Sequence, residues 1–476
     1  MSDGQGGSIA PNDRRALIAI DLGAESCRVS LLRWLADGPS IETVHRFPNF
    51  AEERDGELRW PMGRILDGLE EGLRRCAAIA REGVRSIAVD GWAVDYVRLD
   101  AAGNAIADPF CYRDQRTLAS EAAAHARISA ERMREITGVQ VQRINSVYQL
   151  HADKPGLANL PWLNLPEYVL YKLGARRVSE LTNATHSQLV GLDGRWSEEI
   201  FGALGHSIEL APEIVAPGSD VGRLEGTLRE LPAFAETRLI APACHDTASA
   251  IAGIPESGDD WAYISSGTWS LVGMLLDAPV TSTAAAELNF TNLAAPGGRV
   301  CFHKGVNGMW LLRQCMEDWR KAGADFALPG LLQAAERFQP SGFVLEVDDP
   351  ELLAQGEMPA RINQQLRQRG LRELDATPGG APAMVSLVLH SLAARYAEIL
   401  KRLEELTGRK VARIHIVGGG GQNRFLNRLV AEATGLPVAV GSTESSTIGN
   451  FAVQLAAQEG PRDHSYWAGL LVKAVL

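Results

Sequence analysis

Apolar and turn-forming positions alternate in two matching places along the chain. Residues 16–20 and 29–34 are apolar runs on either side of a turn-rich stretch around Gly23, which predicts a β-hairpin. Residues 261–264 and 269–276 form a second such pair around a short turn of hydroxyl residues and glycine. Because the second half of the chain repeats the layout of the first, we predict an internally duplicated protein.

A third apolar run, residues 413–417, leads into four glycines and then into a helical pattern from Arg424. A glycine-rich turn of this kind lets the backbone approach a ligand closely. A long helix is predicted where apolar residues recur every three or four positions from Val385 to Leu406, before Gly408 can end it. Strands mixed with helices indicate an α/β protein.

The chain of 476 residues exceeds what one core comfortably supports, so we expect two domains with a cleft between them. We place them at residues 16–253 and 254–476, after a flexible, small and polar N-terminus of residues 1–15. Residues 277–299 and 323–382 are rich in Pro, Gly, Thr and Ala with weak periodicity. We expect loops or lid elements in those two stretches.

Charge and cysteine content narrow the class of protein. The net charge of -11 disfavours a nucleic-acid partner, which needs clustered Lys and Arg. No apolar run approaches the roughly 20 residues that span a bilayer, so no membrane role is expected. The 6 cysteines lie far apart without a CxxC pair, which indicates reduced thiols in the cytoplasm. A small-molecule substrate fits best, for a protein that is a monomer or a homodimer.

The two hairpin turns are candidates for a phosphate site. No GxxxxGK[ST] motif is present, so a P-loop is excluded. Asp21, at the end of the first strand, is placed to orient a hydrated Mg²⁺ beside the polar residues of the turn 23–28. Residues 266–268 present small side chains and amides that suit phosphate oxygens. Either turn alone is also explained as an ordinary hairpin turn, and only their pairing favours phosphoryl transfer.

Asp246 is the candidate general base. It follows the apolar run 239–242 and precedes the small-residue stretch 248–253, a strand-to-helix junction that can face a cleft. There its carboxylate would take the proton of an attacking sugar hydroxyl, while His245 bonds a neighbouring hydroxyl. The alternative is that Asp246 only caps a helix.

Residues 90–95 have the composition of a polyol site. The ring of Trp92 can stack on sugar carbons, and Asp90 and Asp95 can accept hydrogen bonds from hydroxyls. Residues 112–116 and 182–185 are dense in donors and acceptors and are candidates for the same pocket. A half-buried strand followed by a turn explains residues 90–95 equally well.

A series of segments, in order and spacing, resembles the FGGY carbohydrate kinases, and among them the rhamnulokinase branch. The resemblance covers nearly the whole chain. It rests on AIDLGAESCRVSLL, VDGWAVDYVRLD, YRDQRT, INSVYQLHA, LTNATHSQLVGLDG, ACHDTASAIAG, YISSGTWSLVGM, GMWLL, IHIVGGGGQNRFLNRL and STIGNFAVQLA.

This resemblance implies a two-domain actin-like ATPase fold, ribonuclease H-like, with duplicated domains and an interdomain cleft. It implies transfer of a phosphoryl group from ATP, with Mg²⁺, to the 1-hydroxyl of L-rhamnulose or a related ketose. The N-terminal domain is then the sugar-binding domain, the C-terminal domain the nucleotide-binding domain, and Asp246 the proton acceptor. The residues expected at ATP are Ala24, Glu25, Ser26, Cys27, Arg28, Gly267, Thr268, Gly419 and Gly420, and those at the sugar are Trp92, Ala93, Asp95, His245 and Thr247.

Several positions depart from the family pattern. Glu25 and Cys27 stand in a turn that is usually made of smaller residues. Gly305 stands where a sugar-binding Asn is usual, and Asn307, two residues on, is our candidate for that contact. Arg313 stands where a nucleotide-contacting Gln is usual, and we assign it to the nucleotide site. A lost amide near the sugar costs about 1–3 kcal/mol, so these departures bear on which sugar is used.

Two alternatives follow from these departures and from the fold. The first keeps the reaction and changes the sugar to L-fuculose, L-ribulose or D-xylulose. The second is an actin-like nucleotide switch or scaffold that hydrolyses ATP without a sugar substrate. The pair of His245 and Asp246 argues against the switch, since a switch has no need of a base for a sugar hydroxyl.

Overall fold

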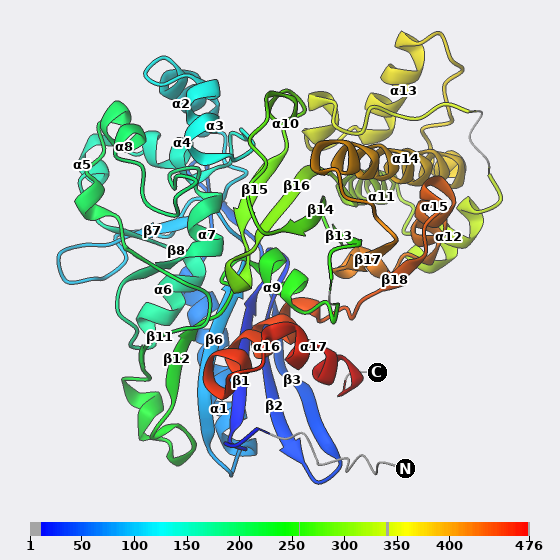
Figure 1. Ribbon diagram of the computed structural model, residues 1–476. Coiled ribbons are helices and arrows are strands. Elements are labelled where there is room, and N and C mark those ends of the chain that lie inside the picture. The colour runs from blue at the N-terminus through cyan, green and yellow to red at the C-terminus, as the bar shows by residue number, and fades with distance from the viewer. Residues whose placement is uncertain (1–10, 257, 339–341, 475–476) are drawn as a thin grey trace.

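The computed structural model describes residues 11–256, 258–338 and 342–474. Its framework is two six-stranded mixed sheets, which occupy the lower and upper parts of Figure 1. The short helix α9 (Asp246–Ala252) lies between them and contacts strands of both sheets. Residues 1–10, most of the N-terminus predicted to be flexible, lie outside the described residues. Within residues 11–15, the backbone N–H of Asn12 donates to Glu459 Oε2 at 2.8 Å.

The first sheet contains the first predicted hairpin. β1 (Ala16–Leu22) is buried along its whole length, as the apolar run 16–20 predicts, and pairs antiparallel with β2 (Ser26–Leu35). β3 (Gly38–Pro48) extends the sheet antiparallel beyond β2, while β6 (Val84–Gly91) runs parallel to β1. The complete order is β11 (Ser219–Arg223), β12 (Arg238–Ala241), β6, β1, β2, β3.

The second sheet repeats this plan. β13 (Trp261–Ser266) and β14 (Trp269–Leu276) form the second predicted hairpin, and β17 (Arg413–Val417) runs parallel to β13 as β6 does to β1. The predicted duplication is therefore confirmed for the order and direction of five strands in each sheet, and the sixth strand is added at opposite edges. The complete order is β15 (Thr291–Ala294), β16 (Val300–Asn307), β14, β13, β17, β18 (Val438–Val440).

The C-terminal helices return to the first sheet. Apolar side chains of α16 (Ser445–Glu459) and α17 (His464–Leu471) pack on Leu17, Ala19 and Leu32, which belong to β1 and β2. Both helices are drawn in red against the blue strands in Figure 1. The last segment of the chain therefore completes the core that the first segment begins.

The predicted long helix is present as α14 (Ala381–Thr407), and Gly408 ends it with a left-handed φ of 70°. Segment Pro378–Thr407 is long and apolar enough to cross a membrane by length and composition, but 67% of its apolar window is buried inside the protein. It packs on β14 and on α15 (Arg424–Thr434) within the core of the second sheet. Its hydrophobicity is therefore explained by core packing.

The prediction of loops or lid elements for residues 277–299 and 323–382 was wrong in part. The first stretch contains α10 (Thr283–Glu287) and β15, whose residues Thr291–Leu293 are buried at the sheet edge. The second contains α12 (Leu328–Ala335) and α13 (Met358–Gln368), and α12 packs on α14. Of these elements, α10, β15 and α12 are too short to produce a clear period in the sequence.

Further helices cover the two sheets and form a lobe beside the first. The largest is α1 (Met62–Ile79), whose apolar face packs on β2 and β3. The others are α2 (Thr117–His125), α3 (Ala130–Thr137), α4 (Ser146–His151), α5 (Pro155–Ala158), α6 (Leu165–Lys172), α7 (Leu181–His186), α8 (Glu198–Leu204) and α11 (Trp310–Lys321). Three short strand pairs lie outside the two large sheets: β4 (Glu52–Arg54) with β5 (Glu57–Arg59), β7 (Tyr96–Arg98) with β8 (Trp162–Asn164), and β9 (Val178–Glu180) with β10 (Glu213–Val215).

Candidate active site

A cavity of about 460 Å³ lies between the β1–β2 turn of the first sheet and the β13–β14 turn of the second. Both halves of the chain form its walls, as expected for a cleft between two duplicated units. The predicted site residues that line it are Asp21, Ala24, Glu25, Ser26, Arg28, Trp92, Ala93, His245, Asp246, Thr247, Gly267, Thr268 and Gly419.

Strand pairing brings three carboxyl groups to one edge of the first sheet. Asp21 near the end of β1 pairs in register with Asp90 near the end of β6. Gly91 forms a parallel bridge with His245, so that Asp246 begins α9 directly beyond that edge. The carboxyl ends of neighbouring parallel strands meet at one edge of a sheet, where ligands of α/β proteins bind.

Burial and mutual repulsion raise the pKa values of two of these groups. Burial, and then the charge of Asp21, raise the pKa of Asp246 to about 7. The same two causes raise the pKa of Asp90 well above its ordinary value. Asp90 Oδ2 accepts from Asn450 Nδ2 at 2.6 Å, and its Oδ1 has no partner among the described residues. A carboxyl group with a pKa near neutrality suits a general base.

His245 is held neutral beside Asp246. Burial, and then the imidazoles of His186 and His303, lower the pKa of His245 well below its ordinary value. Its Nε2 lies 3.5 Å from Asp246 Oδ1. Thr247 Oγ1 donates to the same oxygen at 3.2 Å. Asp246 therefore has polar neighbours that orient its carboxyl group at the start of α9.

Arg28 joins the phosphate turn to the C-terminal segment. Its guanidinium lies 3.0 Å from Asp21 Oδ2 and 2.7 Å from Glu444 Oε2. Ser446 Oγ also donates to Asp21 Oδ2, at 2.5 Å. A largely buried guanidinium beside backbone amides of a tight turn is the donor set that binds phosphate oxygens.

A second cavity of about 550 Å³ adjoins the first and shares Glu25, Gly267, Thr268 and Gly419 with it. Arg313 of α11 and Gly420 of the glycine turn line this second cavity. A glycine is required at position 420 by close packing, since a β-carbon there would lie 2.1 Å from Ser266 Oγ. The two hairpin turns therefore stand where the two cavities meet.

The carboxylates fit a hydrated divalent cation better than a closed metal cage. Among the described residues, no three His, Cys, Asp or Glu side chains form a ligand cluster. Mg²⁺ in phosphoryl-transfer sites is usually held by one or two carboxylates, substrate phosphates and several waters. The charge of Asp21 raises the pKa values of Asp90 and Asp246, and these three groups together supply the negative charge that such an ion would neutralise.

Asp95 does not line either cavity, which corrects its prediction as a sugar contact. The carboxylate is fully buried and accepts from Trp60 Nε1 at 2.6 Å, Trp92 Nε1 at 3.0 Å and Gln149 Nε2 at 2.9 Å. With all these donors engaged, Asp95 fixes the ring of Trp92 at the cavity wall instead of binding ligand.

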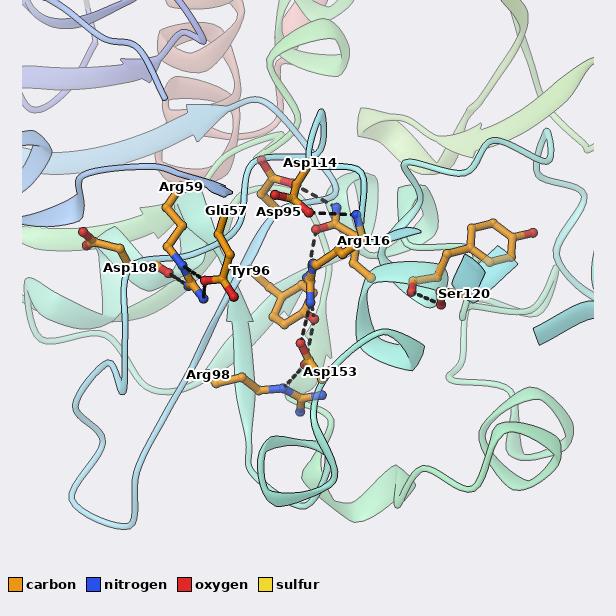
Figure 2. Close-up of polar contacts among 12 residues, drawn as sticks. Glu57, Arg59, Asp95, Tyr96, Arg98, Asp108, Asp114, Arg116, Ser120 and Asp153 are labelled. Carbon is orange, nitrogen blue, oxygen red and sulfur yellow. Dashed lines mark hydrogen bonds and ion pairs between the residues drawn. The ribbon is translucent and has the colours of Figure 1, made fainter. Parts of the chain in front are cut away.

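Asp95 belongs to a larger buried polar network behind the cavity, drawn in Figure 2. Its centre is Asp153, which accepts from Arg98 at 2.8 Å and from Arg116 at 2.7 Å. Asp114 accepts the backbone N–H of Leu58 at 2.8 Å. Within the predicted segment 112–116, Tyr112 and Arg113 line the cavity, whereas Asp114 and Arg116 support it from behind.

Asn307 and Cys27 also lie behind the walls of the site. The backbone N–H of Asn307 donates to Asp348, and its side-chain amide donates to the carbonyl of Leu352 at 3.3 Å, so this residue anchors the segment between α12 and α13. Cys27 is buried in β2, and burial raises the pKa of its thiol to about 12. Neither side chain is available to a ligand in the cavity. The segment 182–185 is likewise absent from the residues that line the two cavities.

Sequence reasoning missed several residues of the cavity wall, among them Gln142 and His186. His186 lies edge-on against His245, with ring centroids 4.7 Å apart, and burial lowers its pKa to about 4. His186 lies within a segment that carried the family resemblance, but no spacing rule links it to His245. Gln142 lies in a loop without regular structure, where the sequence has no signal for it.

The two halves of the chain match known domain families. Residues 16–253 match the N-terminal domain, and residues 262–458 the C-terminal domain, of the FGGY family of carbohydrate kinases. The chain belongs to this family and is a carbohydrate kinase.

Curated relatives match along nearly the whole chain. A rhamnulokinase of Enterococcus faecalis is 35% identical over 454 residues, which cover 94% of this chain and 90% of the relative. A rhamnulokinase of Bacteroides thetaiotaomicron is 33% identical, and the match covers 93% of this chain and 90% of the relative. A rhamnulokinase of Bacillus subtilis is 31% identical, and the match covers 94% of this chain and 91% of the relative. The predicted resemblance is confirmed at the level of sequence.

Solved structures of sugar kinases share the fold. A ligand-bound xylulose kinase from Lactobacillus acidophilus superimposes with a TM-score of 0.77 at 16% identity, covering 96% of this chain and 92% of its own. A glycerol kinase of Plasmodium falciparum with ADP gives a TM-score of 0.73 at 14% identity and the same coverage. The predicted two-domain actin-like, ribonuclease H-like fold is confirmed.

Proposed function

We propose that the protein transfers the γ-phosphoryl group of ATP to the 1-hydroxyl of L-rhamnulose. The observation that carries the proposal is the position of Asp246, a partly buried carboxyl group at the start of α9 in a cavity that faces two phosphate-type turns. The choice of sugar is supported by the three rhamnulokinases that match more than nine tenths of the chain. We assign residues 16–253 to sugar binding and 254–476 to nucleotide binding.

In the proposed reaction the sugar lies in the first cavity with its 1-hydroxyl at Asp246. The Asp246 carboxylate takes the hydroxyl proton as the hydroxyl oxygen forms its bond to the γ-phosphorus. The bond between that phosphorus and the β–γ bridging oxygen breaks, and ADP leaves. Neutral His245, 3.5 Å from Asp246, orients a second sugar hydroxyl, and the ring of Trp92 packs against sugar carbons.

ATP is assigned to the second cavity, with its phosphates between the two hairpin turns. Ala24, Ser26 and Arg28 contact phosphate oxygens from one side and Gly267 and Thr268 from the other. The adenosine lies along Gly419 and Gly420, near Arg313. Asp21 would hold the Mg²⁺ of the nucleotide, and the ion would neutralise phosphate charge. The reaction belongs in the cytoplasm, which agrees with 6 cysteines that are all buried and unpaired.

A coupled ADP-release assay with Mg²⁺-ATP tests the proposal on L-rhamnulose, L-fuculose, L-ribulose, D-xylulose, D-fructose and glycerol. We expect the highest kcat/KM for L-rhamnulose. A higher kcat/KM for another sugar would mean that this sugar, and not L-rhamnulose, is the substrate, while the proposed phosphoryl transfer stands. ATP hydrolysis that no sugar stimulates contradicts the proposal and favours a nucleotide switch.

A further inference from the structure

The wall of the first cavity has a gap at Gly305 of β16, where the strand faces the sugar end of the cavity without a side chain. A β-carbon at this position would lie 3.2 Å from Leu271 Cδ2, 3.3 Å from Gln140 Oε1 and 3.5 Å from Gln142 Nε2. Two glutamine amides therefore border the space that a side chain at position 305 would enter.

The side-chain amides of the two glutamines differ in their hydrogen bonds. Gln140 is buried, and its Oε1 accepts the backbone N–H of Gly305 at 3.2 Å, so this amide holds β16 against the loop. Gln142 lines the cavity, and its side-chain amide makes no hydrogen bond to another described residue. Gln142 is only partly buried, so this amide is open to a molecule in the cavity.

We propose that Gln142 is a specificity-determining residue whose side-chain amide bonds a ring or chain hydroxyl of the sugar, through the space that Gly305 leaves open. This inference rests on the proposed function, because it takes the cavity to hold a polyol. An amide both donates and accepts, so it matches a hydroxyl in either role. A site that offers such a partner discriminates strongly against a sugar lacking the hydroxyl, because its amide is then left unpaired.

The test compares Gln142→Leu with a matched control, Gln115→Leu. Leucine keeps much of the side-chain volume and removes both polar atoms. Gln115 is exposed and does not line either cavity, so its substitution reports the effect of a Gln-to-Leu change alone. Both variants are assayed for kcat/KM on the sugar of the panel that the wild type uses best, and on its 3-, 4- and 5-deoxy analogues.

We expect Gln142→Leu to lower kcat/KM for the parent sugar by about 10- to 150-fold, the range for one lost hydrogen bond in a site. The KM for ATP and the melting temperature should stay near those of Gln115→Leu. For one deoxy analogue the loss should disappear, which identifies the hydroxyl that Gln142 bonds. A merely structural role would lower kcat/KM equally for the parent sugar and all three analogues.

Activity of Gln142→Leu within twofold of the control on the parent sugar overturns the inference, as does an equal loss on every analogue. Because the comparison uses whichever sugar the wild type prefers, a preference for L-fuculose or D-xylulose contradicts the proposed substrate but still tests Gln142. Failure of the wild type on every sugar contradicts both proposals.

Discussion

The carboxylate of Glu25 is in ion-pair contact with the guanidinium of Arg313, across the junction of the two cavities. Glu25 lies in the β1–β2 turn of the first sheet, and Arg313 in α11 beside the second. Thr268 Oγ1 also donates to Glu25 Oε1, at 3.4 Å. Both members of the pair are departures from the family pattern, and the fold brings them together where we assign the nucleotide phosphates.

Replacing Glu25 should therefore strengthen ATP binding. Glu25→Gln removes a negative charge from the phosphate site and frees Arg313 for the nucleotide. The side chain of Glu25 is 61% exposed and that of Arg313 is 38% exposed. Water screens such a pair, so the effect on ATP binding should be modest. We expect KM for ATP to fall by up to about fivefold, since exposed ion pairs are worth roughly 0.2–1 kcal/mol.

Initial-rate kinetics at saturating sugar measure this KM. Glu135→Gln, at an exposed Glu of α3 that also pairs with an arginine, serves as the control. A rise in KM for ATP on replacing Glu25 would contradict this account and assign Glu25 to holding the nucleotide or its metal.

A second prediction concerns the crossing of α16 and α9. A β-carbon on Gly449 would lie 1.7 Å from the carbonyl oxygen of Ser249 and 2.8 Å from the backbone nitrogen of Gly253. Gly449→Ala should force the helices apart, costing about 1–3 kcal/mol of unfolding free energy. Because α9 begins at Asp246, kcat should fall as well.

Denaturant unfolding and steady-state kinetics check this prediction together. Gly202→Ala, in the exposed part of α8 with open space around it, is the matched control and should be neutral or stabilising. Equal stability of the two variants would mean that the helix crossing tolerates a methyl group.

A third prediction is that three carboxyl groups with raised pKa values contribute less to the stability of the ligand-free protein as pH rises from about 4 to about 8. Burial raises the pKa of Asp246 to about 7, of Glu167 to about 7 and of Glu180 to about 8. Over this window the folded state binds more protons through these groups than the unfolded state, so their contribution to the free energy of unfolding falls with rising pH.

Thermal unfolding of Asp246→Asn beside the wild type isolates one of these groups. Between pH 5 and pH 8 the melting temperature of the variant should rise relative to that of the wild type. The difference should grow by roughly 2–4 °C for each kcal/mol of destabilisation that ionisation of Asp246 causes in the wild type. A difference that stays constant with pH would show that Asp246 is ionised throughout this range.

A fourth prediction is that activity rises with pH through the same region. Asp246 must lose its proton to act as a base, so kcat/KM at subsaturating substrates should increase towards a plateau with an apparent pKa near 7. The test measures kcat/KM between roughly pH 5.5 and pH 8.5, a range that extends to both sides of this pKa. A kcat/KM that does not change over that range would contradict a base that titrates near neutral pH.

Sequence patterns predicted the parts of the fold that have long or repeated signals. The hairpins at β1–β2 and β13–β14 are bounded by turn residues, and α14 has a period that Gly408 ends. The short elements β15 and α12 have too few residues for a period to appear, and they exist because they pack on β16 and α14.

For the site, sequence patterns identified residues with suitable functional groups, but they did not predict which of those side chains point into the cavity. Asp21 near the end of β1 and Asp246 at the start of α9 both line the cavity. Asp95 has equally suitable chemistry but turns into the core, where Trp60, distant in sequence, donates to it. Gln142 reaches the cavity only because β16 passes beside its loop, and local sequence does not encode such a contact.

The most direct test of the central claim is sugar-dependent ADP release by Asp246→Asn beside the wild type, with ATP binding measured by calorimetry on the same samples. The account predicts that the variant binds ATP nearly as the wild type does, while kcat with L-rhamnulose falls by about 10²- to 10⁴-fold, the range for loss of a general base. A variant that keeps near-normal kcat would contradict the account, because the proton would then pass to another group.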